Sequence, residues 1–155
     1  MQGHMSAEAR LKELGTELPP PFAPAGSYVA ARVSRGMIYV SGQGPAGPEG
    51  LVIGKVGRHL TLEEGVAAAR LVGLNLLAVM RAELGTLDRV TSIVKLLGMV
   101  NCAPGFNDTP TVINGCSDLL VDVFADPGRH ARSAVGMAEL PFDIAVEVEL
   151  VAEVD

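Results

Sequence analysis

The chain has 155 residues, a length that predicts one domain with one hydrophobic core. Hydrophobic residues make up 48% of the chain and charged residues only 19%, which excludes a disordered protein and indicates that part of the surface is buried in an oligomer. The net charge is −6, aromatic residues make up 4%, and no run of Lys or Arg is present, so nucleic acid is not an expected partner.

The N-terminal residues indicate a cloning remnant followed by a short helix. Residues 1–5, Met-Gln-Gly-His-Met, are typical of a cloning remnant, and they are left out of the fold prediction. Ser6 is a favourable N-cap for a helix over residues 7–14, and Gly15 is a suitable stop. We expect this helix to be an appendage to the domain.

A proline-rich segment leads from this helix into the domain. Four prolines between positions 19 and 24 favour extended chain, so we expect a helix and lead-in over residues 6–27 and the domain proper over residues 28–155. No apolar run is long enough for a membrane span, and Cys102 and Cys116 form no CxxC pair. These features favour a cytoplasmic protein that has no membrane partner.

The domain begins with a predicted β-hairpin. Residues 28–34 and 37–41 are two β-prone runs, and the Arg35-Gly36 pair between them is typical of a tight turn. Residues 42–50 contain four glycines and two prolines, which predicts a loop. Residues 51–56 are then expected to form a brief third strand.

Two helices alternate with strands in the rest of the chain. Thr61 and Glu64 form a capping-box pattern, and helical spacing of apolar residues continues to a stop at Gly85. The β-branched residues 90–100 predict a central strand. The remaining predicted elements are a second helix from residue 106 or 107 to 124 and two last strands over residues 131–137 and 144–154.

This order of elements predicts an α+β fold with a mixed sheet. Two strand–helix–strand crossovers of the same hand place both helices on one face of the sheet and leave the other face to water or a partner. On the last strand, Val146, Val148 and Leu150 alternate with Glu147 and Glu149, which share the opposite face.

Arg132 could lie beside one of these glutamates if the last two strands pair antiparallel. An Arg and a carboxylate on a buried sheet face would form a fixed receptor for a carboxylate ligand, because a guanidinium matches two oxygens. A salt-bridged oligomer interface is the alternative interpretation of the same residues.

No metal or cofactor is expected. His59 and His130 are far apart and have no ligand at metal-site spacing, and the glycines of residues 42–50 match neither a phosphate loop nor a dinucleotide fingerprint. Cys102 and Cys116 are interpreted as core thiols rather than nucleophiles.

Several motifs together resemble the Rid/YjgF family from Tyr28 to the end of the chain. The motifs are Val40-Ser41-Gly42-Gln43, His130-Ala131-Arg132-Ser133-Ala134-Val135, Leu140-Pro141 and Val146-Glu147-Val148-Glu149. An Asn114-Gly115-x-Ser117-Asp118-Leu119 helix and the N-terminal helix are similar to those of a longer subgroup that is often labelled endoribonuclease-like.

The resemblance implies a chorismate-mutase-like fold, with two helices on one face of the sheet, and a homotrimer whose active sites lie in clefts between subunits. It implies hydrolysis of reactive 2-imino or enamine acids to 2-keto acids and ammonia, without a cofactor. Arg132 would bind the substrate carboxylate and Glu147 would hold or activate the water. The other residues implied to contact substrate are Tyr28, Ser41, Gly42, Ser133 and Asn114.

Three positions depart from the pattern of the family's imine deaminases. Ala134 stands where many members have Cys, Gly136 where Glu is common, and Pro110 where a helix Asn usually faces the site. The retained Arg132 indicates that a small carboxylate still binds. Two alternatives to the enzyme therefore remain: a regulatory trimer that binds a small carboxylate without turnover, and an endoribonuclease, against which the net charge of −6 argues.

Overall fold

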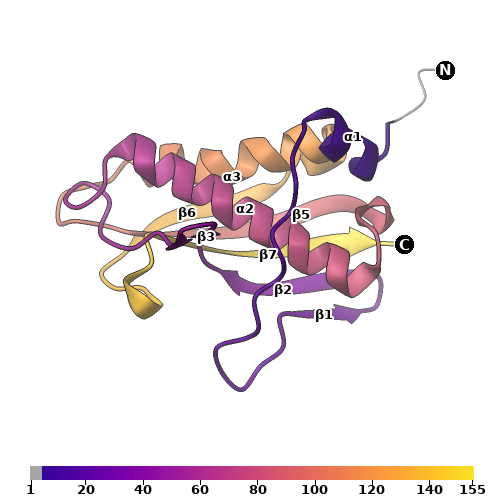
Figure 1. Cartoon of the computed structure of the whole chain (residues 1–155), viewed down its shortest axis with the longest axis horizontal. Helices are drawn as coiled ribbons and strands as arrows, with labels where there is room; N and C mark the ends of the chain where they lie inside the picture. The colour runs from indigo at the N-terminus through magenta and orange to yellow at the C-terminus, as the bar shows by residue number, and fades with distance from the viewer. Residues whose placement is uncertain (1–4) are drawn as a thin grey trace.

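A layer of helices covers one face of a five-stranded sheet in the computed structural model, which describes residues 5–155 (Figure 1). Most of the predicted cloning remnant, residues 1–4, lies outside the described residues. The α+β fold class is confirmed, and α2 and α3 pack side by side on the same face, as the crossovers predict.

The described chain forms these helices: α1 (Ala7–Glu13), α2 (Leu62–Leu84) and α3 (Thr109–Phe124), with the short 3-10 turns η1 (Leu87–Arg89), η2 (Asp126–Gly128) and η3 (Pro141–Asp143). The strands are β1 (Ala31–Ser34), β2 (Met37–Gln43), β3 (Ala46–Gly47), β4 (Gly50–Leu51), β5 (Val90–Asn101), β6 (Ala131–Met137) and β7 (Val146–Val154).

The strands lie in the order β1-β2-β7-β5-β6, so β7 is the middle strand and β6 is an edge. β6 pairs in parallel with β5, because helix α3 carries the chain back across the sheet between them. β7 pairs antiparallel with both β5 and β2. The predicted antiparallel pairing of the last two strands is therefore wrong, since β5 lies between β6 and β7.

Helix α2 has the ends that its sequence predicts. The Thr61 hydroxyl accepts a hydrogen bond from the Glu64 amide, the Glu64 carboxylate accepts one from the Thr61 amide, and Gly85 ends the helix with a left-handed backbone (φ 85°). By length and composition α2 could cross a membrane, but most of it is buried against α3 and the sheet. It is the core helix of a soluble fold.

Helix α3 starts later than predicted. Asp108 is its N-cap residue and Pro110 lies in its first turn, where a missing backbone N–H costs no helical hydrogen bond. The segment before it, which begins at Phe106, is therefore part of the connection from β5 and not a first helical turn.

The N-terminal helix α1 is not an appendage, which corrects the prediction. Ala7 and Leu11 are buried in the main hydrophobic core, where α1 contacts α3. The Glu8 carboxylate accepts hydrogen bonds from both Nε and Nη2 of Arg81 on α2 and from the Leu87 amide. These contacts explain why Arg81 lowers the pKa of Glu8, and they make α1 part of the domain.

The structure differs from the predicted strands on both sides of the glycine-rich loop. Residues 51–56 do not form a third strand of the main sheet. Gly50 and Leu51 pair with β3 in a separate two-stranded ribbon, and Ile53 and Val56 form isolated bridges, to Ile144 and Cys102 among others. Strand β2 itself continues to Gln43, beyond the predicted end at Ser41.

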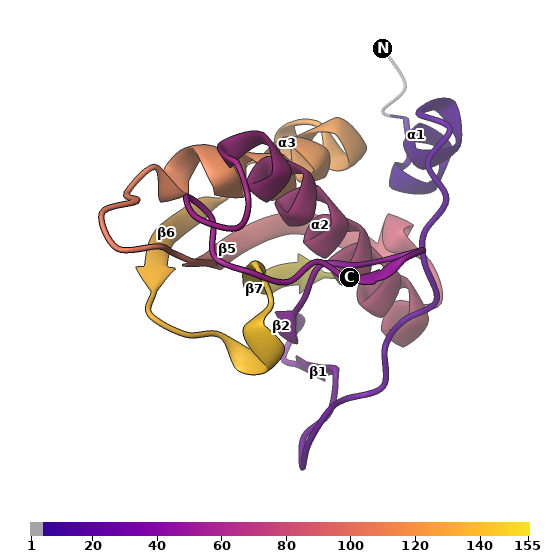
Figure 2. The ribbon, with the colours of Figure 1, turned by 60° about the vertical axis from the view of Figure 1, so that its left-hand side comes forward.

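The two faces of the main sheet differ in burial. Val146, Val148 and Leu150 of β7 face the helices and are buried, as predicted, whereas Glu147 and Glu149 face the other way. No helix covers that second face within the described residues, and Figure 2 shows the helix layer on one side of the sheet alone. This uncovered surface is called the open face below.

Candidate functional site

Glu147 lies directly over a glycine at an irregularity in strand β2. The regular pairing of β2 with β7 breaks between Val40 and Gln43, so Ser41 and Gly42 form a bulge. A Cβ atom on Gly42 would lie 2.6 Å from Oε2 of Glu147, closer than two such atoms can approach. Gly42 therefore leaves the space in which the Glu147 carboxylate lies.

Glu147 lines a mostly apolar cavity of about 420 Å³. The residues lining it are Phe22, Ala23, Pro24, Ala25, Tyr28, Ala30, Gly42, Gln43, Gly44, Ala46, Leu51, Pro141, Phe142, Ile144 and Glu147. Burial raises the pKa of Glu147, and the neighbouring Glu149 raises it further. A carboxylate of raised pKa is a stronger base than an exposed one, as general-base chemistry near neutral pH requires.

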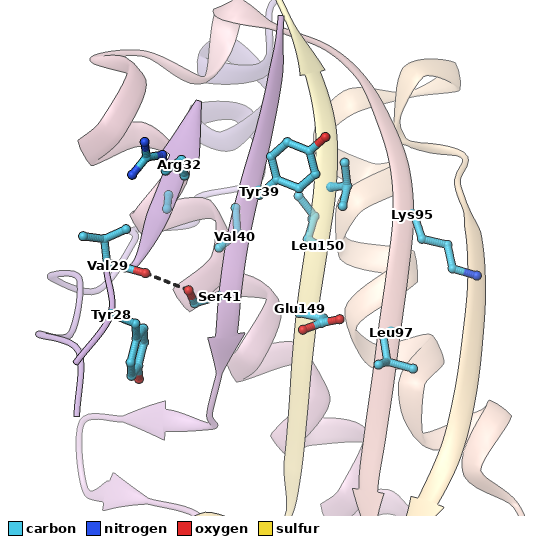
Figure 3. Close-up of a pocket in the computed structure, with 12 residues that line it drawn as sticks. Tyr28, Val29, Arg32, Tyr39, Val40, Ser41, Lys95, Leu97, Glu149 and Leu150 are labelled. Atoms are coloured by element: carbon cyan, nitrogen blue, oxygen red, sulfur yellow. Dashed lines mark hydrogen bonds between the residues drawn. The ribbon is translucent and has the colours of Figure 1, made fainter. Parts of the chain in front are cut away.

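Tyr28 and Ser41 connect the lead-in segment to this site. The Ser41 hydroxyl donates a hydrogen bond to the Val29 carbonyl (2.7 Å), and the Tyr28 hydroxyl accepts one from the Ala25 amide (3.3 Å). Figure 3 shows Tyr28, Ser41 and Glu149 in a row across the open face. The structure therefore brings four predicted site residues together around the bulge: Tyr28, Ser41, Gly42 and Glu147.

A buried polar network holds the loop on the far side of the cavity. Asn101, at the end of β5, is fully buried, and its Nδ2 donates to Oδ1 of Asp143 (2.9 Å) and to the Ile144 carbonyl (3.1 Å). Lys55 Nζ donates to Oδ1 of Asn101 (2.8 Å). Sequence reasoning assigned no role to these residues, although a polar Asn at the end of a buried apolar strand was a usable signal.

Arg132 lies in a second polar cluster, on the helix side of the edge strand β6. Its Nη1 donates to the Ser117 hydroxyl oxygen (3.0 Å) and its Nη2 donates to the Pro110 carbonyl (3.0 Å). Both acceptors belong to α3, so they fix the plane of the guanidinium. A guanidinium has five N–H donors, so others remain for a ligand.

His130 orients the serine that contacts Arg132. Its Nδ1 is 2.7 Å from the Gly128 carbonyl, which can only accept, so Nδ1 carries the proton. Nε2 then accepts from the Ser117 hydroxyl (2.9 Å), and the serine presents its lone pairs to Arg132. Burial lowers the pKa of His130, which keeps the imidazole neutral near pH 7 and preserves this arrangement.

Asn114 and Ser133 lie on different sides of Arg132. Asn114 is exposed on α3, four residues after Pro110 and three before Ser117, so it shares the helix face that carries both acceptors of Arg132. Ser133 is exposed on β6, and its pairing with Leu97 places it on the open face.

Arg132 and Glu147 do not meet within one chain, and the expectation that strand pairing brings them together is wrong. Arg132 pairs with Leu96, which in turn pairs with the buried Leu150, so Arg132 is on the helix side of the sheet. Glu147 is on the open face, two strands away, a separation of about 10 Å across the sheet. The predicted site residues therefore form two separate clusters.

The described part of the chain was compared with the requirements of a metal site and of a reactive thiol. Across residues 5–155, no three His, Cys, Asp or Glu side chains lie together as a metal site requires. Cys102 and Cys116 are free thiols, and burial raises the pKa of Cys116 to about 12. A thiol with so high a pKa is a poor nucleophile at neutral pH.

Two named relatives match nearly the whole chain. Protein TCP17 of Trypanosoma cruzi is 46% identical over 149 residues, which cover 95% of this chain and 93% of that protein. A protein of Lactococcus lactis subsp. lactis (strain IL1403), named "Putative regulator AldR", is 30% identical over 135 residues, covering 85% of this chain and 92% of that one.

Solved structures share the fold. Atu1372 from Agrobacterium tumefaciens, a protein of unknown function, superposes with a TM-score of 0.87 at 42% identity, covering 96% of this chain and 92% of that one. E. coli TdcF with bound serine superposes with a TM-score of 0.61 at 24% identity, covering 88% and 94%, a likeness that concerns the fold alone. The family model described as "YjgF/chorismate_mutase-like, putative endoribonuclease" matches residues 8–154. The chain therefore belongs to the YjgF/chorismate mutase-like family.

Proposed function

We propose that this soluble protein hydrolyses reactive 2-imino acids, or the enamines in equilibrium with them, to 2-keto acids and ammonia in the cytoplasm. The observation that carries the proposal is the position of Glu147. Its carboxylate has a raised pKa, lies over Gly42 and opens into an apolar cavity. Such a group is suited to take a proton from a water molecule beside a bound substrate.

The active site is proposed to form between two copies of the chain in a homotrimer. Arg132 and Glu147 lie on opposite faces of one sheet, so one small substrate cannot touch both within a chain. The open face carries exposed apolar side chains such as Tyr39, and β6 is a free edge of the sheet. A second copy that brings its β6 edge to the open face of the first would join the two clusters.

The proposed roles follow from the chemistry of each cluster. Arg132 binds the substrate carboxylate with the N–H groups that Ser117 and Pro110 do not use, and a paired N–H fork matches the two carboxylate oxygens. Asn114, on the same helix face, supplies an amide to that ligand. Tyr28, Ser41 and Gly42 shape the opposite wall, and Ser133 borders the cleft from the β6 edge.

The reaction needs no more than these groups. A protonated imine carbon is already electrophilic, so the protein has to fix the carboxylate and place a water next to that carbon. Glu147 accepts a proton from the water as its oxygen attacks, which forms a carbinolamine. Glu147 then returns the proton to the nitrogen and the C–N bond breaks. Ammonia leaves as the hydroxyl of the carbinolamine gives its proton to the ionised Glu147 and becomes the keto oxygen, and Glu147 then releases that proton to the ammonia or to solvent.

A regulatory protein that binds a small carboxylate without turnover is the second candidate. The name of the Lactococcus lactis relative, "Putative regulator AldR", favours it, and so does Pro110, which stands where imine deaminases of the family usually have Asn. Both candidates use the same cleft. They differ only in whether the bound molecule is converted, which a turnover assay measures directly.

The test is keto-acid release from imines generated in situ by an amino-acid oxidase, with and without this protein. We expect the protein to accelerate release of the keto acid. Arg132→Ala should abolish ligand binding, because loss of a charged partner of this kind costs about 2–5 kcal/mol. Glu147→Gln should retain ligand binding and slow hydrolysis by roughly 10² or more.

Three results would count against the proposal. If imine lifetimes stay unchanged at stoichiometric protein while keto acids still bind, the regulatory candidate replaces the enzyme. If Arg132→Ala binds keto acids as tightly as the parent, the carboxylate site is wrongly assigned. If the protein cleaves RNA, and the Arg132 change removes that cleavage, the endoribonuclease alternative becomes the better one.

A further inference from the structure

We propose that the cavity over Glu147 receives the substrate's side chain and selects large apolar ones, of the leucine or phenylalanine kind, over a methyl group. The inference rests on the proposed function, since it assumes that a 2-imino or 2-keto acid binds in this cleft. Two walls of the cavity carry it: the lead-in segment before β1 and the η3 loop between β6 and β7.

The first wall is the proline-rich lead-in, whose residues 22–25 line the cavity. Phe22 is 57% exposed and lines the cavity beside Ala23 and Pro24. Two hydrogen bonds hold the end of this segment: the Ala25 amide donates to the Tyr28 hydroxyl, and the Ser41 hydroxyl donates to the Val29 carbonyl. These two bonds hold the chain directly after Phe22 and Pro24, which line the cavity together with Glu147.

The second wall is the η3 loop, which holds Phe142 in a strained conformation. Phe142 and Asp143 have φ values of 58° and 59°, in the left-handed region that residues other than glycine rarely adopt. Two contacts maintain this backbone: Asn101 Nδ2 donates to the Asp143 carboxylate (2.9 Å), and the Gly54 amide donates to the Asp143 carbonyl (2.8 Å).

The result of that strain is an aromatic ring at the rim of the cavity. Phe142 is 72% exposed and lines the cavity together with Pro141 and Ile144. Strain of this kind persists only where surrounding contacts enforce it, and it is concentrated at ligand-binding and catalytic sites. A buried asparagine that serves to hold an exposed phenylalanine over a cavity is best explained by a ligand that the phenylalanine covers.

The size and charge of the cavity define the side chain it accepts. A volume of about 420 Å³ lies within the range of roughly 300–1,000 Å³ typical of small-molecule sites, and a methyl group would leave most of it empty. Glu147 is the one charged residue among the described lining residues, so the walls offer no partner for a charged side chain. A branched aliphatic or aromatic group fits both features.

The test is calorimetric binding of three 2-keto acids to the full-length protein: pyruvate, 4-methyl-2-oxopentanoate and phenylpyruvate. We expect the two larger acids to bind at least tenfold more tightly than pyruvate, because each extra methylene in an apolar pocket changes selectivity about tenfold or more. Hydrolysis of the imines of alanine, leucine and phenylalanine should show the same order in kcat/KM.

Variants of the two walls test the assignment. Phe142→Ala and Phe22→Ala should each reduce the preference for the larger acids about tenfold. Leu14→Ala is the matched control, since Leu14 is also an exposed apolar residue, 43% exposed, but lies outside the cavity, and it should keep the parent preference. Phe142→Leu, which keeps an apolar group at the rim, should retain most of the preference if Phe142→Ala proves unstable.

The outcomes separate this inference from the proposed function. Equal or tighter binding of pyruvate, no binding of any of the three acids, or an unchanged preference in both cavity variants overturns the inference. Tight and selective binding without turnover of any imine supports the inference and overturns the catalytic part of the proposed function. Turnover that favours the alanine imine supports the enzyme and overturns the selectivity.

Discussion

The surroundings of Glu147 favour a neutral side chain over an ionised carboxylate. Its pKa is raised above the ordinary value of 4.5, first by burial and then by Glu149. The folded state therefore holds the proton more tightly than the unfolded state does. The stability that the protonated form contributes is lost as pH rises from about 4.5 through the raised folded pKa, so the ionised carboxylate is unfavourable at pH 7.

Glu147→Gln is accordingly expected to raise the melting temperature at pH 7 while it slows hydrolysis. Gln is neutral at every pH, so the gain should shrink as pH falls below about 4.5, where Glu147 is protonated in both states. Thermal melts at pH 4 and pH 7 measure this. Glu83→Gln, on the exposed surface of α2, is the control and should show no such dependence. A lower melting temperature for Glu147→Gln at pH 7 would show that the carboxylate has a stabilising partner.

The sequence correctly predicted which face of the sheet a side chain occupies where the alternation of residues along a strand determines it. Glu147 and Glu149 lie opposite Val146 and Val148 because alternate residues of a strand point to opposite faces. The same rule could not place Arg132, since the face of an edge strand depends on which strand it joins and in which direction. The Ser117–His130 pair was also missed, because its members meet only after α3 and β6 pack together.

At the scale of elements, a glycine in the middle of α3 controls how closely the two long helices approach. A Cβ on Gly115 would lie 2.1 Å from the Val66 carbonyl oxygen of α2. Helix propensity alone suggests that this glycine weakens α3 by about 1 kcal/mol relative to alanine. The structure supplies its reason, which is that α2 and α3 pack with backbone nearly in contact at this point.

Gly115→Ala should therefore destabilise the protein although alanine is the better helix former. A clash with a backbone atom cannot be relieved by a side-chain rotation, so the helices must separate, at a net cost of about 1–3 kcal/mol. Denaturant unfolding measures the change. Asp118→Ala, which alters an exposed residue of the same helix, should leave stability unchanged or slightly increased. Equal or greater stability of Gly115→Ala would show that the two helices can move apart freely.

Capping residues in the sequence correctly predicted the ends of the long helix α2. The capping box at Thr61 and the glycine at position 85 define α2 correctly, because caps act within one turn of the helix. Docking of α1 was not predictable in the same way. Its two buried residues, Ala7 and Leu11, are too few to reveal a core-facing stripe, and its ion pair with Arg81 spans more than seventy positions.

At the scale of the whole molecule, the described chain carries two clusters of proposed site residues on opposite faces of the sheet. The Glu147 cluster lies on the open face, and the Arg132 cluster lies between β6 and α3. The sequence motifs include residues of both clusters but did not predict their separation, because motif spacing carries no information on sheet order. Assembly is therefore the step on which the proposed activity depends.

The homotrimer can be tested by measuring mass and activity together. Light scattering at micromolar concentration should give about three times the chain mass of 16.1 kDa. Tyr39 lies on the open face, is 49% exposed, and lines the same hollow as Arg32 and Lys95 (Figure 3). A lysine there removes apolar contact area and adds a third cation, so Tyr39→Lys should dissociate the trimer without unfolding the chain.

Loss of the trimer should abolish imine hydrolysis even though every proposed catalytic residue is still present in Tyr39→Lys. Leu14→Lys makes the same change at an exposed apolar residue outside the open face, and it should keep both the mass and the activity of the parent. A parent mass near 16.1 kDa, or full hydrolytic activity in a monomeric Tyr39→Lys variant, would mean that the substrate binds one of the two clusters alone. In that case Glu147 and Arg132 could not act on the same molecule, since the two side chains lie on opposite faces of the sheet.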